Sequence, residues 1–157
     1  MPNQKQIVEN HSTLDVEDIR HFIFDRDAAD NPLLLDVAYT DDEIARAMRY
    51  ACLSFNEVTP YVFTIQPECM PFSMLFIHGT IYHLYLSRIS ELSRRDVDHT
   101  AGNMTVDVTK RLIANLTALV ALHKKEFDTS AKQRKIAFNV SQAFRNFGGR
   151  GPVGGTW

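Results

Sequence analysis

Histidines are the residues of this sequence that most suggest metal chemistry. The chain has six of them, and His78 and His83 lie in a strongly apolar segment. Imidazole is a common zinc ligand, but two ligands on one helix need a spacing of three or four residues. Five residues apart on a helix, His78 and His83 would point about 140° away from each other. We therefore predict no metal site and expect core or interface histidines that hydrogen-bond a hydroxyl group.

A second group that could bind a metal is the acidic stretch that begins at Asp25. Calcium loops of the EF-hand type need an oxygen ligand at position 5, a glycine at position 6 and a glutamate at position 12. Counted from Asp25, these positions hold Ala29, Asp30 and Asp36. The pattern fails at each of them, so we interpret these acids as solvated loop residues.

Nucleophilic and acid–base chemistry have no matching pattern either. Cys52 and Cys69 form no C-x-x-C pair and lie among apolar residues, so we predict two free, buried thiols. Glu68 and Glu91 have no evident partner carboxylate. The chain lacks a G-x-x-x-x-G-K-[ST] phosphate loop, a G-x-S-x-G turn and an H-E-x-x-H motif. We therefore predict no catalytic residue and no cofactor, and we do not expect an enzyme.

Length and composition are those of one globular domain. The chain has 157 residues, of which 45% are hydrophobic and 23% charged, and this suits a domain with its own core. It starts with a polar stretch rather than a secretory signal, and it has no apolar run of about 18 residues that would span a membrane. Unpaired cysteines fit a reducing compartment.

The charges are unevenly spread along the chain. Residues 1–59 carry twelve acids against five bases, whereas residues 129–157 carry five bases and no acid. Such a dipole favours head-to-tail contacts between copies of the chain, although two solvated faces would give the same pattern. The candidate inter-subunit residues are Asp41, Asp42, Glu43, Lys132, Arg134 and Lys135.

Capping and periodicity predict the first two helices. Thr13 or Asp15 can start a short helix, and Thr40 with Glu43 forms a capping box that starts a longer one. The segment 60–71 contains three prolines, and we expect an extended connector there, with a short strand as the alternative. The apolar face of the second helix comprises Ile44, Ala47, Met48, Ala51, Cys52 and Phe55.

Two further helices follow. The first runs from Pro71 to Arg95 and is apolar almost all round, so it should be the most buried one. Gly79 lies inside it and costs about 1 kcal/mol relative to alanine, so it should mark a close approach of another helix. Residues 105–147 form either one long helix or two helices broken near residues 128–130. Their apolar stripe comprises Leu112, Leu116, Leu119, Val120, Phe127, Ile136, Val140 and Phe144.

The elements together predict an all-α fold, a small antiparallel helical bundle with an extended Gly-rich C-terminal arm. Short connections favour antiparallel neighbours. We divide the chain into a flexible N-terminus (1–13), a helical bundle (14–147) and a tail (148–157). The end of the chain, FGGRGPVGGTW, has five glycines and the only tryptophan. It is too glycine-rich to fold alone, so it either stays disordered or becomes ordered on a partner.

The layout of the chain resembles the small neck proteins of tailed bacteriophages, the head-to-tail adaptor or connector group. In IRHFIFDRDAADNPLLLDVAYTDDEIARAMRYACLSFNEVTP, a short helix leads to an N-P-L loop, to a helix start at Asp42-Glu43 and to a stop between Asn56 and Pro60. The second half has the apolar helix FSMLFIHGTIYHLYLSRI and a long helix that ends in KQRKIAFNVSQAFRNFGG. The resemblance covers about residues 15–147 and rests on layout and scattered residues.

This resemblance implies a structural role in the virion neck, after synthesis in the cytoplasm of the host bacterium. Such proteins form a ring, usually of twelve copies, between the portal of the DNA-filled head and a neck or tail terminator protein on the tail side. The ring could also contact packaged DNA in its channel, and no membrane would be involved. The C-terminal arm would dock on the portal, and its candidate contacts are Arg145, Phe147, Arg150, Pro152, Val153 and Trp157.

Two other classes of function stay open from the sequence. A small helical regulatory or accessory protein could bind protein or nucleic acid, since the basic end interleaves bases with phenylalanines. The overall pI of about 6.3 argues against a dedicated nucleic-acid binder. An enzyme whose site follows no motif is the third class.

Overall fold

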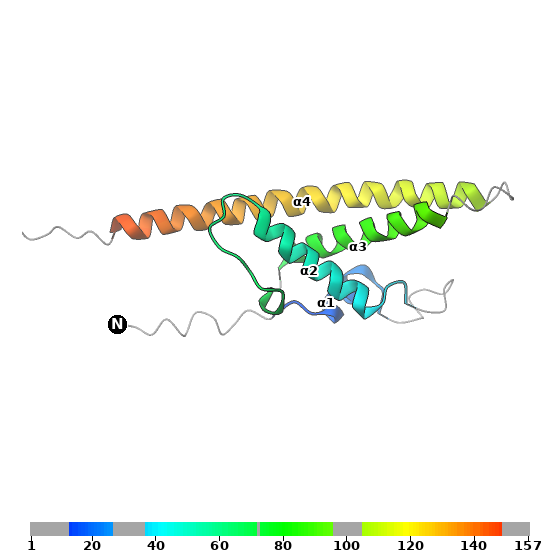
Figure 1. Cartoon of the computed structure of the whole chain (residues 1–157), viewed down its shortest axis with the longest axis horizontal. Coiled ribbons are helices and arrows are strands. Elements are labelled where there is room, and N and C mark those ends of the chain that lie inside the picture. Colours follow the sequence, from blue (N-terminus) through cyan, green and yellow to red (C-terminus); the bar gives the residue numbers. More distant parts are fainter. Residues whose placement is uncertain (1–12, 27–36, 72, 96–104, 149–157) are drawn as a thin grey trace, which may run out of the picture.

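The computed structural model describes residues 13–26, 37–71, 73–95 and 105–148. Over these ranges the protein forms helices and no strand: α1 (Val16–Ile23), α2 (Asp41–Glu57), the short 3-10 helix η2 (Pro67–Cys69), α3 (Met74–Arg95) and α4 (Thr105–Gly148). Figure 1 shows α4 running along the whole molecule, with α3 against it and α2 crossing α3 obliquely. The predicted all-α fold is therefore confirmed for this part of the chain. Residues 1–12, the connection 96–104 between α3 and α4 and the arm beyond Gly148 lie outside the described residues.

Reciprocal capping boxes fix the starts of α1 and α2. Asp15, rather than Thr13, caps α1: its carboxylate accepts from the Asp18 N–H at 2.9 Å, and the Asp18 carboxylate accepts from the Asp15 N–H at 3.0 Å. Thr40 and Glu43 form the predicted box at α2. Each pair satisfies N–H groups that have no partner inside the helix.

The core lies where α2 and α3 face each other. All six residues of the predicted apolar face of α2 are buried, from Ile44 to Phe55. From α3 they meet Phe76, Ile77, Ile81 and Leu84, which are also buried. Ile19 of α1 closes one side of this core. The period of 3.6 residues thus predicted the buried face of α2 completely.

Gly79 is the point at which three helices meet. A Cβ added to this residue would lie 2.7 Å from the Phe127 ring of α4 and 3.0 Å from the Cβ of Ala51 of α2. No larger side chain fits at these separations unless a buried neighbour moves, since Phe127 is only 2% exposed. The predicted close approach at Gly79 is confirmed.

The last helix is continuous over 44 residues, with no break near residues 128–130. Its partner α3 has 22 residues, and at 1.5 Å per residue it is about 33 Å long against about 66 Å for α4. In Figure 1 the orange-to-red end of α4 extends past the rest of the described chain. About half the length of α4 therefore extends beyond what α3 can cover.

The predicted apolar stripe of α4 is wrong for most of its residues. Leu116 and Phe127 are buried and Val120 is half-buried. The other five are 40% or more exposed: Leu112, Leu119, Ile136, Val140 and Phe144. Successive residues of an α-helix are rotated by about 100° around its axis. The side chains of the predicted stripe therefore do not all point to one side of α4, and only some of them face α3.

The connector between α2 and α3 is the expected extended loop. The Asn56 side chain pairs with the backbone of Ile65 in both directions, at 2.9 Å each. Leu14 N–H donates to the Met70 carbonyl at 2.9 Å, so the chain just before α1 is tied down as well. The predicted burial of both cysteines is half wrong, because Cys52 is buried and Cys69 is exposed. Both thiols are free.

We expect Gly79→Ala to destabilise the protein by about 1 kcal/mol. Overpacking against Phe127 costs about 1–3 kcal/mol, and the better helix propensity of alanine offsets about 1 kcal/mol of it. Urea unfolding followed by circular dichroism measures the change, with Ser90→Ala at an exposed position of α3 as the control. A more stable Gly79→Ala protein would contradict the close packing. In a double-mutant cycle, Phe127→Leu should recover part of the loss.

Candidate functional site

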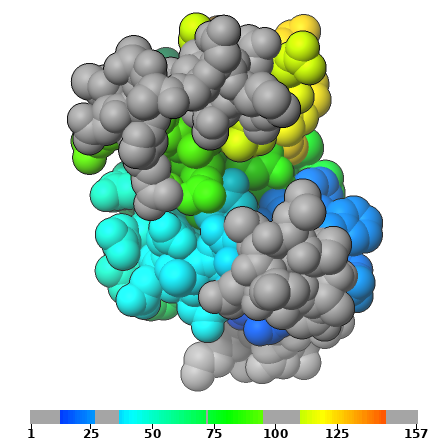
Figure 2. Space-filling model, turned by 90° about the vertical axis from the view of Figure 1, so that its right-hand side faces the viewer, coloured from blue at the N-terminus to red at the C-terminus, as the bar shows by residue number. Residues whose placement is uncertain are grey.

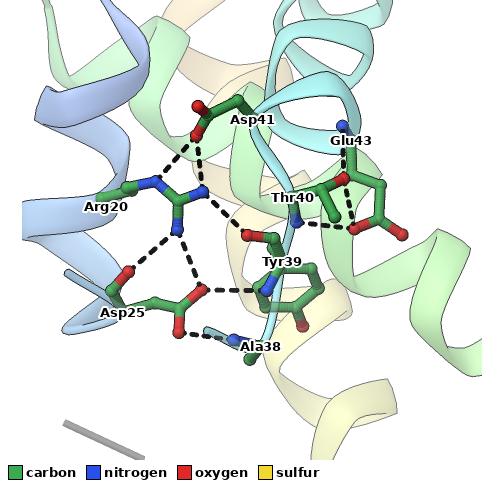
Figure 3. Close-up of polar contacts among 7 residues, drawn as sticks. All are labelled: Arg20, Asp25, Ala38, Tyr39, Thr40, Asp41 and Glu43. Carbon is green, nitrogen blue, oxygen red and sulfur yellow. Dashed lines mark hydrogen bonds and ion pairs between the residues drawn. The ribbon is translucent and has the colours of Figure 1, made fainter. Parts of the chain in front are cut away.

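Arg20 is the centre of the largest polar network in the described part of the chain (Figure 3). Its side chain is buried, and its guanidinium donates to the Asp41 carboxylate at 2.6 and 3.0 Å. It also donates to the Tyr39 carbonyl at 2.9 Å and to the Asp25 carbonyl at 3.0 Å. These bonds join the end of α1 to the segment that leads into α2. A planar donor group of fixed geometry suits this role.

Asp25 completes the network from the other side. Its carboxylate accepts from the Ala38 N–H at 2.7 Å and the Tyr39 N–H at 3.0 Å, and Arg20 lies 3.5 Å away. Asp25 is buried and its carboxylate joins residues 25 and 38, so the prediction of a solvated loop acid is wrong for this residue. Among the described residues no group of three or more metal-binding side chains occurs. Asp27, Asp30 and Asp36 lie outside these residues.

The predicted acidic contacts at the start of α2 have different roles in the structure. Asp41 pairs with Arg20, and Glu43 accepts from both the N–H and the hydroxyl of Thr40. Asp42 is exposed. Asp41 nevertheless keeps 75% of its side chain exposed, so the end of the molecule at α2 remains acidic. Asp42 is the residue of this group that a partner could use without disturbing the fold.

Lys135 was predicted as a surface contact, and this prediction is wrong. The residue is fully buried, and its ammonium donates to the carbonyls of Asn56 at 3.0 Å and Val58 at 2.7 Å. It also lies 4.8 Å from the centre of the Phe55 ring. Lys135 therefore caps the last turn of α2, which has no basic residue of its own. Burial lowers the pKa of this lysine.

The remaining predicted contacts are only partly placed. Lys132 and Arg134 are exposed on α4. Arg145 and Phe147 belong to the last turn of α4, and only their backbone is described. The other candidate contacts of the arm lie outside the described residues: Arg150, Pro152, Val153 and Trp157.

A cleft of about 230 Å³ opens between α2 and α3. Arg46 and Arg88 line it together with Glu43 and Glu91, and Arg88 pairs with Glu91 at 2.6 Å. The two positive and two negative charges of the lining cancel. The cleft is also smaller than the pockets of about 300–1,000 Å³ that usually hold organic ligands. It therefore gives no basis for a substrate.

The histidines of α3 form contacts that the sequence predicted only in part. His83 bonds the Ser54 hydroxyl at 3.0 Å, as predicted. His78 instead meets the ring of His123, with the two Nδ1 atoms 2.8 Å apart. No spacing rule could reveal this pair, because the partners are 45 residues apart on different helices.

Comparisons with protein-family models, with curated proteins and with solved structures found no match to this chain. In the part of the chain that the structure describes, no helix is long and apolar enough to cross a membrane.

We expect Arg20→Gln to destabilise the protein by about 2–4 kcal/mol. The substitution leaves the Asp25 carboxylate buried without its cation and removes the bonds that hold the start of α2. Urea unfolding measures the change, and Arg49→Gln, at an exposed position of α2, is the matched control. Equal loss of stability in the two variants would show that the network does not stabilise the fold.

Proposed function

We propose that this chain is a structural subunit of a phage virion neck, which forms a ring between the portal and the tail. The observation that carries the proposal is the separation of exposed charges of opposite sign, with acids at the start of α2 and bases on α4 near the end of α2. The start of α2 carries three acids, whereas Lys132 and Arg134 are exposed on α4 beside Lys135, which bonds the backbone at the opposite end of α2. Helix α2 has 17 residues, so about 25 Å separates the two groups. These groups cannot meet within one molecule, but they can meet between copies.

Exposed apolar side chains accompany the charges at both ends. At the acidic end, Phe24 is 72% exposed and adjoins Asp25, which the Arg20 network joins to Asp41. Figure 2 views this end and shows α1 and the start of α2 together on its surface. At the basic end, Ile136, Val140 and Phe144 form an exposed ridge at a spacing of four residues. Each end thus offers exposed apolar side chains near its charged residues.

Contacts between unlike ends of one molecule are heterologous, and they close into a ring when the rotation between neighbours allows it. Each contact can be weak, because a ring repeats it many times. The helix α4 ends at Gly148 at the tip of its projecting part. Gly148 therefore lies away from the bundle, and we propose that the residues that follow it bind the portal. The resemblance to phage neck proteins gives the proposal its specific form.

A variant with the charge of one end reversed should assemble less. A mixture of two variants, one reversed at the acidic end and the other at the basic end, should assemble again. Asp42→Lys, and Lys132→Glu with Arg134→Glu, should each assemble less than the unmodified chain at low salt. An equimolar mixture of the two proteins should assemble again, since each altered end then meets an altered partner. Mass photometry gives the particle masses. Failure of the mixture to assemble would rule out a contact between these two ends.

Deletion of residues 148–157 should leave a folded helical protein that no longer joins a portal. The bundle loses no described core residue by this change. Circular dichroism checks the fold, and co-sedimentation with a candidate portal protein measures binding. Normal binding by the truncated protein would exclude docking by the arm. Binding to DNA that falls steeply with salt, with indifference to any portal, would favour a nucleic-acid-binding regulator instead.

A further inference from the structure

Two imidazole rings meet between the start of α3 and the middle of α4. The Nδ1 atoms of His78 and His123 are 2.8 Å apart, and both side chains are half-buried. At this distance one nitrogen must carry a proton and donate it, while the other accepts with its lone pair. At least one of the two rings is therefore neutral whenever the contact is formed.

The groups around the pair offer no negative charge to a protonated ring. From α1, Phe22 packs edge-on against His78, and from α3, Tyr85 packs edge-on against His123. From α4, Lys124 adds a positive charge nearby and is itself paired with Asp128 at 2.8 Å. Within the described residues no carboxylate bonds to either ring.

Burial and the positive charge of a neighbouring ring both lower the pKa of an imidazole. Burial, and then the proximity of His78, lower the pKa of His123. Burial and Lys124 likewise lower the pKa of His83, the third imidazole of this region. Unfolded histidines take up a proton near pH 6.5. The folded protein resists protonation at this place, so acid favours the state in which the rings are apart.

We propose that the His78–His123 contact is an acid-sensitive latch between α3 and α4. When both rings carry a proton, two positive charges face each other at the contact and the hydrogen bond is lost. The latch lies one residue from Gly79 and one helical turn from Phe127, whose ring packs tightly against Gly79. Acid therefore weakens the packing of α4 against α3 near Gly79.

The sign of the pH dependence follows from proton linkage. A base whose pKa is lower in the folded state binds fewer protons there than in the unfolded chain. Its contribution to stability is complete above about pH 6.5 and decreases as the pH falls toward the folded pKa. The unfolding equilibrium constant should rise by up to about tenfold for each pH unit in that window.

The test is urea unfolding of the full chain between pH 5 and 8, with EDTA present to remove trace metals. The variant His123→Asn keeps an N–H near the position of Nδ1 but cannot titrate. In this variant the unfolding equilibrium constant should rise much less as the pH falls than in the unmodified protein. His21→Asn, at an exposed position of α1, should match the unmodified protein. His83→Gln separates the contribution of the third ring. Equal pH profiles for His123→Asn and the unmodified protein would overturn the latch.

Nitrogen-15 NMR of the unmodified protein provides a second measurement that needs no variant. Each imidazole gives its own titration curve, so the two rings can be compared with the exposed His21. The latch requires at least one ring of the pair to protonate at clearly lower pH than His21. If His78 and His123 both titrate together with His21, the rings do not share a proton and the proposal fails.

Discussion

The packing of the whole molecule depends on the absence of one side chain, at Gly79. There α2, α3 and α4 come close enough that even a Cβ would overlap the Phe127 ring and touch Ala51. A glycine inside a helix costs about 1 kcal/mol, and the burial of Phe127 and Ala51 offsets this cost. This contact fixes the position of α4 relative to α2 and α3. It thereby also positions Lys135 and His123, because both lie on α4 within two or three turns of Phe127.

A second constraint is the difference in length between α3 and α4. A helix gains stability in a protein mainly from tertiary packing, yet α4 buries few residues beyond the reach of α3. Isoleucine, valine and phenylalanine at the projecting end are exposed, although they are poor choices for a solvated helix surface. A second molecule that covers this ridge would account for both the length of the helix and its composition, and this links the fold to the proposed assembly.

The sequence predicted what local rules determine. Caps at Thr40 and the apolar face of α2 depend on spacing within one helix, and both predictions were confirmed. Such rules could not predict the contacts of Arg20 and Lys135, since their partners lie 21 and 79 residues away along the chain. The α4 stripe failed for a related reason: periodicity shows which residues share a face, but not how much of that face a partner covers. Of the candidate inter-subunit charges, Asp42, Lys132 and Arg134 are exposed as a contact requires, whereas Lys135 is buried.

The charges of this protein divide into those that hold α2 and those that remain available. Arg20 fixes the start of α2 through Asp41, and Lys135 caps its end through the Asn56 and Val58 carbonyls. Both cations are buried, so a partner cannot use them without unfolding the helix they hold. Fewer charges are therefore available to a partner than the composition suggests. Of the candidate inter-subunit residues, those that remain available are Asp42 with the exposed part of Asp41, and Lys132 with Arg134. A contact made by so few charges would fix the register of two subunits, while the exposed apolar side chains beside them would supply most of the affinity.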